Sequence, residues 1–546
     1  MNRREFLRST SAIVGGSLLG SCVEGQQQAS DAGAIAVAGL PMATTAGFDV
    51  LRQGGNALDA AVTAALVAGV VGIYECGIGG YGGHLTLALP GGKTITSIDF
   101  NTQAPAAAQD DMFRPDKEGR VKDRVNEVGW LASGVPGTLA GMQLALDRFG
   151  TYSFRQAVQP AIRWAQEGFP LTDSAAKVIA TASEQLQKDP GSAKLFFKEG
   201  KPLQAGDRFR NPELGKLLQT LAERNSVDSF YRGDLSKQIA QAFQQNGGLV
   251  TEKDMAAYQA REVKPLEMSW GGCQLYTAPL TAGGLTIFET IGILKALNWQ
   301  KRVADGPDDP RTTRARLEAL RLAWHDRLNL LGDPEKTKVP TDRLLSEEYA
   351  GQLAKRVDKA LVDEKPVAAT TDGKTSDGTI HISTADAKGM LVALTLTHGG
   401  QFGAQVTVPG LGLVLGQGMS RFDPRPGQAN SPGPGKRPLH NMCPTIALRN
   451  GQPVLAIGGR GGRRIPNAVL DVLTYALIQE QPIDKAVNLP RLHTAGGLEI
   501  DLHGAWSQEV VEHFQKVGYQ INKRGSAAIS AVTFDPKTKT SQGATR

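Results

Sequence analysis

The sequence has few residues of the kinds that bind metals. Four cysteines and eight histidines occur among 546 residues. The cysteines form no Cys-x-x-Cys pair, and the histidines form no His-Glu-x-x-His or comparable ligand cluster. The sequence therefore predicts no metal site.

A strong excess of one charge and a long apolar run are also lacking. A total of 60 Lys and Arg residues against 54 Asp and Glu residues leaves a net charge of +6, and no long basic run is interleaved with aromatics. We therefore predict no nucleic-acid partner. The apolar segment 56–71 is too short to span a bilayer, so we expect it to form a buried helix.

The N-terminus resembles an export signal. Arg3 and Arg4 precede an apolar run over 11–20, and Cys22 follows directly after a small residue. This pattern is typical of a twin-arginine signal that ends at a lipoprotein cleavage site, and a disordered tail is the alternative. We expect a signal over 1–21, a lipid on Cys22, a polar tether over 22–36, and a periplasmic or cell-surface protein whose membrane contact is this anchor alone.

The three other cysteines are expected to remain thiols. Twin-arginine export carries folded cargo, so these residues fold in a reducing compartment, and an odd number cannot pair completely within one chain. The cysteines concerned are Cys76, Cys273 and Cys443. No structural disulfide is predicted.

The clearest local pattern is a β-hairpin in the C-terminal third. Residues 379–385 alternate in polarity, and 390–397 form a second strand-like run. A three-residue loop over 387–389, with glycine in the left-handed position, would join the two strands. This register places Thr379 opposite Thr397, so two hydroxyls face each other on adjacent strands.

Two glycine-rich segments need a physical reason. Residues 77–82 match Gly-x-Gly-x-x-Gly, but a helix precedes them and a strand follows, which is the wrong order for a dinucleotide site. Residues 458–462 follow a short strand, 453–457, and precede an amphipathic helix over 465–480. The exposed N–H groups of that loop could bind an anion or an oxyanion, or the loop could be only a tight turn.

Several motifs together resemble the γ-glutamyltransferase family. The matches occur in the family's order from about Val37 to the C-terminus. The matching segments are GGNALDAA (54–61), GIGG (77–80), LASGVPGT (131–138), TEKD (251–254), the stretch 316–334 in which EALRLAWHDR runs on to GDP, GKRPL (435–439), PTI (444–446) and NLPRLH (488–493).

The resemblance implies a fold and a maturation step. Family members are N-terminal-nucleophile hydrolases with a four-layer αββα sandwich, an α/β fold, and each chain cuts itself before a threonine. That threonine maps to Thr379, with Gly378 on the departing side. The expected product is a heterodimer of a large subunit, residues 37–378 after the tether, and a small catalytic subunit, residues 379–546.

The resemblance also implies catalytic roles. Thr379, once it is the first residue, has its own α-amino group as an adjacent base, with a pKa of about 7.7 to 8.0. Thr397 matches the second threonine, which hydrogen-bonds the nucleophile. Gly461 and Gly462 match the glycine pair whose N–H groups form the oxyanion hole. The implied substrate is a small-molecule amide, and no cofactor is required.

At the substrate-binding positions the sequence departs from the family. Asn101 stands where glutathione-processing members have an arginine that binds the α-carboxylate. Arg421 stands where they have an acidic residue for the substrate ammonium, Gly399 replaces a nearby asparagine, and His440 and Asn441 replace paired serines. Because an arginine repels an ammonium, the specificity is expected to differ from that of those members.

Three functions follow from this pattern. The first is a γ-glutamyltransferase-like amidase that cleaves or transfers γ-glutamyl, glutathione-type amides through a threonine acyl-enzyme. The second is an acylase of the cephalosporin acylase type, whose acyl group lacks a free α-amino group, and Asn101 and Arg421 favour it. The third is an uncleaved, inactive binding lipoprotein, against which the intact Thr379 and Thr397 argue.

Overall fold

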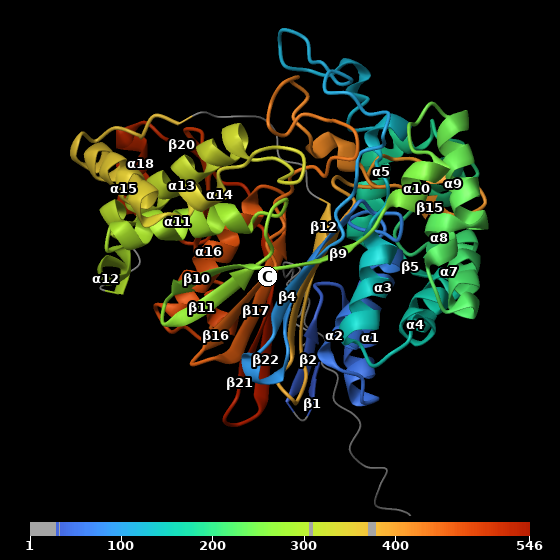
Figure 1. Cartoon of the computed structure of the whole chain (residues 1–546), viewed down its shortest axis with the longest axis horizontal. Coiled ribbons are helices and arrows are strands. Elements are labelled where there is room, and N and C mark those ends of the chain that lie inside the picture. The colour runs from blue at the N-terminus through green and yellow to red at the C-terminus, as the bar shows by residue number, and fades with distance from the viewer. Residues whose placement is uncertain (1–28, 32, 305–308, 370–377) are drawn as a thin grey trace, which may run out of the picture.

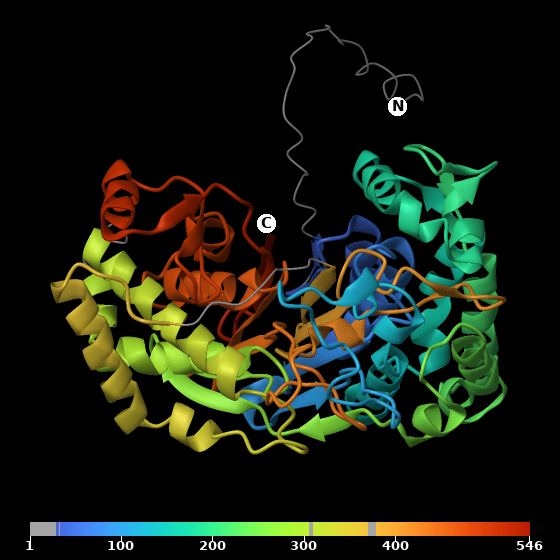
Figure 2. The same ribbon diagram turned by 90° about the horizontal axis from the view of Figure 1, so that it is seen from above.

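Two β-sheets pack face to face, and helices cover the outer face of each (Figures 1 and 2). This computed structural model describes residues 29–31, 33–304, 309–369 and 378–546. The layers run helix, sheet, sheet, helix, which confirms the expected four-layer αββα sandwich. The boundary expected between the two subunits stays a prediction.

The first sheet contains the predicted hairpin near its centre. Its seven strands lie in the order β1-β2-β12-β13-β3-β4-β9, and all neighbours are antiparallel. The strands are β1 (Ala29–Asp31), β2 (Ala34–Val37), β12 (Thr379–Ala385), β13 (Leu391–Thr397), β3 (Gly82–Ala88), β4 (Ile95–Asp99) and β9 (Arg261–Val263). The hairpin strands thus pair on both sides with strands from the N-terminal part of the chain.

The second sheet is also antiparallel, in the order β10-β11-β16-β17-β21-β22. Its strands are β10 (Leu266–Trp270), β11 (Cys273–Thr277), β16 (Thr445–Arg449), β17 (Gln452–Arg460), β21 (Ala528–Asp535) and β22 (Thr540–Thr545). Smaller pairings join β5 (Phe169–Pro170) to β8 (Arg208–Phe209), β6 (Phe197–Lys198) to β7 (Lys201–Pro202), β14 (Thr407–Val408) to β15 (Leu413–Val414), and β18 (Arg491–His493) to β19 (Glu499–His503) and β20 (Gln520–Asn522).

The helices divide into two groups by sequence. On the side of the first sheet lie α1 (Pro41–Arg52), α2 (Ala57–Val71), α3 (Thr138–Phe149), α4 (Phe154–Glu167), α5 (Asp173–Leu186), α6 (Pro190–Phe196), α7 (Pro212–Arg224), α8 (Asp228–Arg232), α9 (Asp234–Gln245) and α10 (Glu252–Ala257). On the side of the second lie α11 (Gly284–Ala296), α12 (Trp299–Ala304), α13 (Pro310–Leu330), α14 (Thr341–Leu344), α15 (Glu347–Val362), α16 (Arg464–Leu477), α17 (Ile483–Ala486) and α18 (Gln508–Val517).

Helix α2 is the buried helix that the sequence predicts. Every residue of α2 is buried, and the Asn56 side chain caps its N-terminus by accepting hydrogen bonds from the N–H groups of Leu58 and Asp59. Because its many alanine side chains are short, α1 and the hairpin strands pack closely against the helix. The N–H of Ala57 also donates to the carboxylate of Asp386 at 3.1 Å, which ties the helix to the hairpin turn.

The hairpin has the predicted register. Thr379 pairs with Thr397, and each later residue of β12 pairs in step with its partner on β13. The turn is closed by Asp386, whose carboxylate accepts hydrogen bonds from the N–H groups of Lys388 and Met390 at 2.9 and 3.1 Å. Gly389 has φ +90°, the left-handed conformation that the loop length requires.

Three expected boundaries differ from the structure. Residues 458–460 belong to β17, because they pair with β21, so the loop is shorter than the predicted 458–462. The helix expected over 465–480 is α16, which begins at Arg464 and ends at Leu477. Residues 29–31 and 34–36, within the expected tether, lie in β1 and β2. These two strands pair with each other, and β2 also pairs with β12.

The layer between the sheets is apolar at one end and polar at the other. The apolar part joins Ile35, Ala385 and Leu391 to Ile446, Ala456 and Val532 of the second sheet. At the other end of β12 and β13 the inward-facing residues are threonine and histidine. This buried polar end is where the predicted site residues lie.

Candidate active site

Thr379 and Thr397 meet at the end of the hairpin. Thr379 Oγ1 donates a hydrogen bond to Thr397 Oγ1 at 3.0 Å, and Thr397 Oγ1 donates to the carbonyl oxygen of Gly378. The N–H of Gly399 donates to Thr397 Oγ1 at 2.8 Å and to the Gly378 carbonyl at 3.3 Å. Two donors therefore converge on the carbonyl that precedes Thr379, an arrangement that would stabilise negative charge on that oxygen.

Gly378 occupies a space that admits no side chain. A Cβ atom there would lie 2.5 Å from the carbonyl carbon and oxygen of Gly400. These are backbone atoms of the segment that follows β13, so they cannot rotate away as a side chain could. Glycine at this position is thus required by packing, in addition to the access it gives to its own carbonyl.

Strand β17 carries the predicted oxyanion loop toward Thr379. Ala456 packs in the apolar cluster with Ala385, whereas Gly458 lies against the ring of His381, two residues from Thr379. The strand thus advances toward the Thr379 end of β12, and Gly461 and Gly462 follow it.

The conformation of that loop suits an anion site. Gly461 and Gly462 have φ +133° and +58°, and they immediately precede the N-terminus of α16. A loop that leads into a helix N-terminus is a common place for an anion to bind. The oxyanion role of the two glycines stays a prediction.

Farther along β12 and β13 from the two threonines lies a row of buried polar side chains. The His381 Nδ1 and Thr395 Oγ1 atoms are 2.7 Å apart, and His381 Nε2 lies 3.1 Å from Ser383 Oγ. Burial lowers the pKa of His381 to about 3, so the ring is neutral at physiological pH. A group with so low a pKa is a poor proton acceptor, and both ring nitrogens contact hydroxyls other than that of Thr379. We therefore expect the base for Thr379 to be another group.

Arg421 and Gly399, two of the predicted substrate-binding residues, do meet beside Thr397. Arg421 ends the short 3₁₀ turn Gly418–Arg421, and its Nη2 donates to the carbonyl of Gly399. A Cβ on Gly399 would lie 3.4 Å from that same nitrogen. The guanidinium therefore contacts Gly399, whose own N–H donates to Thr397 Oγ1.

Asn101 and His440 form a second buried group. The Asn101 side-chain amide donates to Thr281 Oγ1 and to the Pro438 carbonyl, both at 2.7 Å, and the N–H of His440 donates to the Thr281 carbonyl at 3.1 Å. Asn441 follows and is partly buried, its backbone packed against Gly283. In the described part of the chain, Asn101 Oδ1 and His440 Nδ1 have no hydrogen-bond partner.

A histidine pair fixes the orientation of His440. His440 Nε2 lies 2.8 Å from His84 Nδ1, and His84 Nε2 lies 3.4 Å from the Asp99 carboxylate. Burial lowers the pKa of His84 to about 4, and burial together with His84 lowers the pKa of His440 well below its ordinary value. With both rings neutral, one of them donates and the other accepts in the contact between His440 Nε2 and His84 Nδ1.

Two further arginines near the loop form ion pairs. Arg460 pairs with Glu75, in the loop after α2, and Arg464 Nε lies 3.1 Å from the Asp501 carboxylate. Because each already has an acidic partner, neither is well placed to receive a substrate carboxylate, and Arg421 is the better candidate.

The glycine-rich segment 77–82 packs closely against the residues around Thr397. A Cβ on Gly77 would lie 2.3 Å from the His398 ring, one on Gly79 would lie 2.5 Å from the Val414 carbonyl, and one on Gly80 would lie 2.9 Å from the Thr397 carbonyl. The segment leads from α2 into β3, as the sequence predicted, and not from a strand into a helix. Its glycines allow the backbone to pack closely against Thr397 and His398.

Sequence reasoning missed Tyr81 and Glu75. Tyr81 interrupts the glycine run, is almost fully buried, and its ring lies against Gly399. A large polar residue inside a run of glycines is the signal that could have identified it. Glu75 pairs with a residue 385 positions away, and no local pattern indicates that contact.

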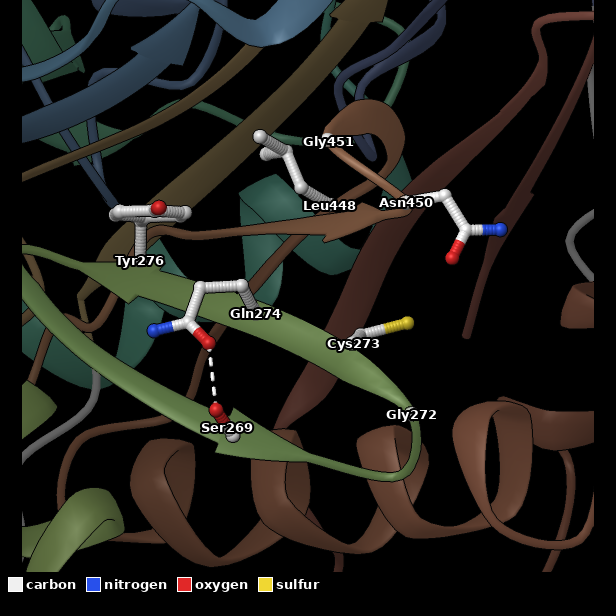
Figure 3. A pocket seen from close by; sticks show the side chains of 8 residues that line it. All are labelled: Ser269, Gly272, Cys273, Gln274, Tyr276, Leu448, Asn450 and Gly451. Atoms are coloured by element: carbon white, nitrogen blue, oxygen red, sulfur yellow. Dashed lines mark hydrogen bonds between the residues drawn. The ribbon is translucent and has the colours of Figure 1, made fainter.

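A surface hollow of about 350 Å³ lies elsewhere (Figure 3). Its lining includes Ser269, Cys273, Gln274 and Tyr276 of β10 and β11, and Ser269 Oγ donates to Gln274 Oε1 at 2.6 Å. Cys273 begins β11, whereas the Thr281 loop follows the other end of that strand. The hollow holds none of the predicted site residues.

The described ranges contain no evident metal site. In them, no group of three or more His, Cys, Asp or Glu side chains is placed to hold a metal ion. No helix in this part of the chain is both long and apolar enough to cross a bilayer. Cys76, Cys273 and Cys443 are buried, free thiols. Cys22 and the export signal lie outside the described residues.

Known proteins resemble the chain over nearly its whole length. The model of the gamma-glutamyltranspeptidase family matches residues 43–545. A glutathione hydrolase proenzyme of Escherichia coli K12 is 38% identical over 467 residues, 83% of this chain and 79% of that protein. The acylase ACY 1 proenzyme of Pseudomonas sp. SE83 is 32% identical over 519 residues, 94% of this chain and 91% of that one.

A solved structure supports the fold independently. The cephalosporin acylase of Bacillus halodurans superposes with a TM-score of 0.84 at 24% identity, covering 97% of this chain and 99% of that one. At this identity the likeness concerns the fold. The family match, the sequence relatives and the paired threonines agree, and the chain belongs to the γ-glutamyltranspeptidase family of N-terminal-nucleophile enzymes.

Proposed function

We propose that the chain cuts itself before Thr379 and that the freed threonine then cleaves or transfers γ-glutamyl amides. The observation that carries this proposal is the hydrogen-bonded set of Thr379, Thr397 and the Gly378 carbonyl. The nucleophile, its partner and the carbonyl to be attacked lie together in one buried cluster.

Maturation would begin with attack of Thr379 Oγ1 on the carbonyl carbon of Gly378. Thr397 Oγ1–H and the N–H of Gly399 would stabilise the oxyanion that forms. The C–N bond then breaks, the nitrogen takes up the hydroxyl proton, and an ester joins Gly378 to Thr379. Water hydrolyses that ester, which leaves a carboxylate on Gly378 and a free α-amine on Thr379.

Turnover would use the same hydroxyl on a substrate amide. The new α-amine, with an ordinary pKa of about 7.7 to 8.0, takes the proton as Oγ1 attacks the amide carbon. The N–H groups of Gly461 and Gly462 would receive the oxyanion, each contributing roughly 3 to 4 kcal/mol. The ammonium returns the proton to the leaving amine, and water or an acceptor amine releases the acyl group from the ester.

The substrate class has two candidates. The E. coli relative is a glutathione hydrolase proenzyme, which favours a γ-glutamyl group, and we propose this class first. Arg421 beside Gly399 favours the second candidate, an acyl group that carries a carboxylate but no free α-amino group. A relative named acylase ACY 1 proenzyme also supports an acylase activity.

The two candidates differ in their response to a charge reversal. Wild-type enzyme is expected to cleave γ-glutamyl-p-nitroanilide, and Arg421→Asp should raise its preference for that substrate over glutaryl-p-nitroanilide. The ratio of the two kcat/KM values should rise by about a hundredfold, the scale of one desolvated charge contact. Release of p-nitroaniline measures both rates.

The control lies in the same loop. Arg425 is exposed and forms an ion pair with Asp423, so Arg425→Asp should leave the ratio within about twofold. A wild-type preference for the glutaryl substrate would favour the acylase. An unchanged ratio in Arg421→Asp would show that the guanidinium does not face the acyl group.

We also propose that the enzyme is exported by the twin-arginine route and anchored by a lipid on Cys22. The sequence pattern of the first 22 residues supports this location. Cys22→Ala should move the enzyme from the membrane fraction to the soluble extract and abolish incorporation of labelled palmitate. Arg3→Lys with Arg4→Lys should instead retain the full-length precursor in the cytoplasm. Membrane attachment that survives Cys22→Ala would refute the anchor.

A further inference from the structure

An ion pair joins the loop of Gly461 and Gly462 to the segment that carries Thr397. Arg460 is the last residue of β17 and directly precedes Gly461. Its Nη1 bonds both carboxylate oxygens of Glu75, at 2.5 Å for Oε2. Glu75 lies in the turn between α2 and β3, so the ion pair connects the second sheet to the first.

The backbone of Glu75 is itself bonded to the residues that follow β13. The N–H of His398 donates to the Glu75 carbonyl at 3.1 Å, and the N–H of Phe402 donates to the Tyr74 carbonyl at 3.0 Å. His398 directly follows Thr397 in the chain. Because two backbone bonds hold this turn, the Glu75 carboxylate has a fixed place relative to Thr397.

The other end of the ion pair is held in the same way. Arg460 pairs with Ala528 in the second sheet, and a Cβ on Gly461 would lie 2.8 Å from Ala527 Cα. The N–H of Arg464 donates to the Gly461 carbonyl at 3.1 Å, which joins the loop to the start of α16. Each partner of the ion pair is thus held by the backbone of its own layer.

Stability of the fold is a weak reason for this contact. The side chains of Arg460 and Glu75 are 29% and 19% exposed, and a partly exposed ion pair contributes little to folding. Its geometric effect is larger, because charge-assisted bonds to both carboxylate oxygens restrict the relative position of the two residues. Glu75 precedes Thr379 in the chain and Arg460 follows it, so the ion pair would still join the two parts after cleavage.

We propose that Glu75 and Arg460 are positioning residues that set the distance between the loop and Thr379. Turnover would need the N–H groups of Gly461 and Gly462 within hydrogen-bond reach of the oxyanion, whose place is set by the nucleophile. Loop and nucleophile lie in different sheets, so a contact between the sheets must fix their separation. This inference rests on the proposed threonine mechanism and the oxyanion role of the loop, but not on which acyl group the enzyme accepts.

Maturation should depend much less on this ion pair. In that step the oxyanion would form on the Gly378 carbonyl, which accepts from Thr397 Oγ1 and from the N–H of Gly399. Both donors lie at the end of β13, so the separation of the two sheets does not set their contacts. Loss of the ion pair should therefore slow turnover and spare self-cleavage, a split that a general loss of structure would not produce.

The test compares Glu75→Gln, Arg460→Gln and the double variant. In each, kcat with whichever anilide wild type cleaves should fall by about tenfold, and KM should change less than about threefold. The double variant should be no slower than either single variant, because the two side chains act as one unit. Arg460→Lys keeps the charge and should have a kcat within about threefold of wild type. Self-cleavage, followed by denaturing electrophoresis, should stay within about twofold of wild type in every variant.

Arg148→Gln is the matched control. Arg148 Nε lies 3.1 Å from the Glu262 carboxylate, in an ion pair between α3 and β9 on the side of the first sheet. This ion pair does not join the two sheets, so its loss should change neither turnover nor self-cleavage.

Three results would overturn the proposal. They are a wild-type kcat in Glu75→Gln and Arg460→Gln, losses that multiply in the double variant, and an equal slowing of self-cleavage and turnover. If wild type cleaves neither anilide, the proposed function is wrong. Acylation of Thr379 by p-nitrophenyl acetate, followed by intact mass, then gives the same comparison between wild type and the variants.

Discussion

Thr379→Ala protein should remain one chain and should have no amidase activity. Without Oγ1 there is no atom to attack the Gly378 carbonyl, so neither the ester nor the free α-amine can form. Because cleavage creates the base, both functions are lost together, and the residual rate should be that of the uncatalysed reaction. Denaturing electrophoresis and intact mass report the first loss, and p-nitroaniline release reports the second.

Thr384→Ala provides the control for this experiment. Thr384 lies on the same strand but on the opposite face, where its hydroxyl donates to the Ala57 carbonyl at 2.7 Å. This variant should still divide into two chains. In wild-type protein, N-terminal sequencing of the small chain should begin TIHIS. Another start, or division of the Thr379→Ala chain, would contradict the assignment of the nucleophile.

Gly378→Ala should strongly slow maturation but should not reduce turnover by the mature enzyme. The added Cβ would lie 2.5 Å from the Gly400 carbonyl, which is fixed backbone, so the carbonyl of residue 378 must move away from its two donors. Displacement of this kind costs about 3 kcal/mol, which corresponds to a cleavage rate lower by about a hundredfold. The time course of chain division at fixed temperature measures the effect.

The fraction that does mature should have a normal kcat. After cleavage residue 378 is the C-terminus of the other chain and is no longer bonded to Thr379. Gly351→Ala, on α15, is the matched control, since a Cβ there meets no described atom within 4 Å. Normal division of Gly378→Ala would show that the Gly400 backbone can yield. A low kcat after division would show that residue 378 stays in the site.

The local parts of the site were predictable because short-range rules decide them. The alternation of 379–385, the glycine at 389 and the loop length together define a register, and that register alone pairs Thr379 with Thr397. The N-cap of α2 and its burial follow from the residues of 56–71 in the same way. Assignment of Thr379 as a nucleophile required the family resemblance as well.

The assembly around the hairpin was not predictable in that way. The pairing of β13 with β3 joins residues hundreds of positions apart, and the contact of Gly458 with His381 joins residues tens of positions apart. No periodicity in the sequence encodes such contacts. The extension of β17 through residue 460 was missed because its glycines read as a loop, yet pairing with β21 holds them in a strand.

The sequence by itself determined the hairpin and its threonine pair, since turn chemistry and side-chain alternation act over a few residues. The tertiary structure decided which groups surround that pair. It placed Arg421 and Tyr81 against Gly399, joined the His440 ring to that of His84, and paired Arg460 with Glu75. Those contacts depend on how two sheets and their loops pack, and packing is a property of the whole chain.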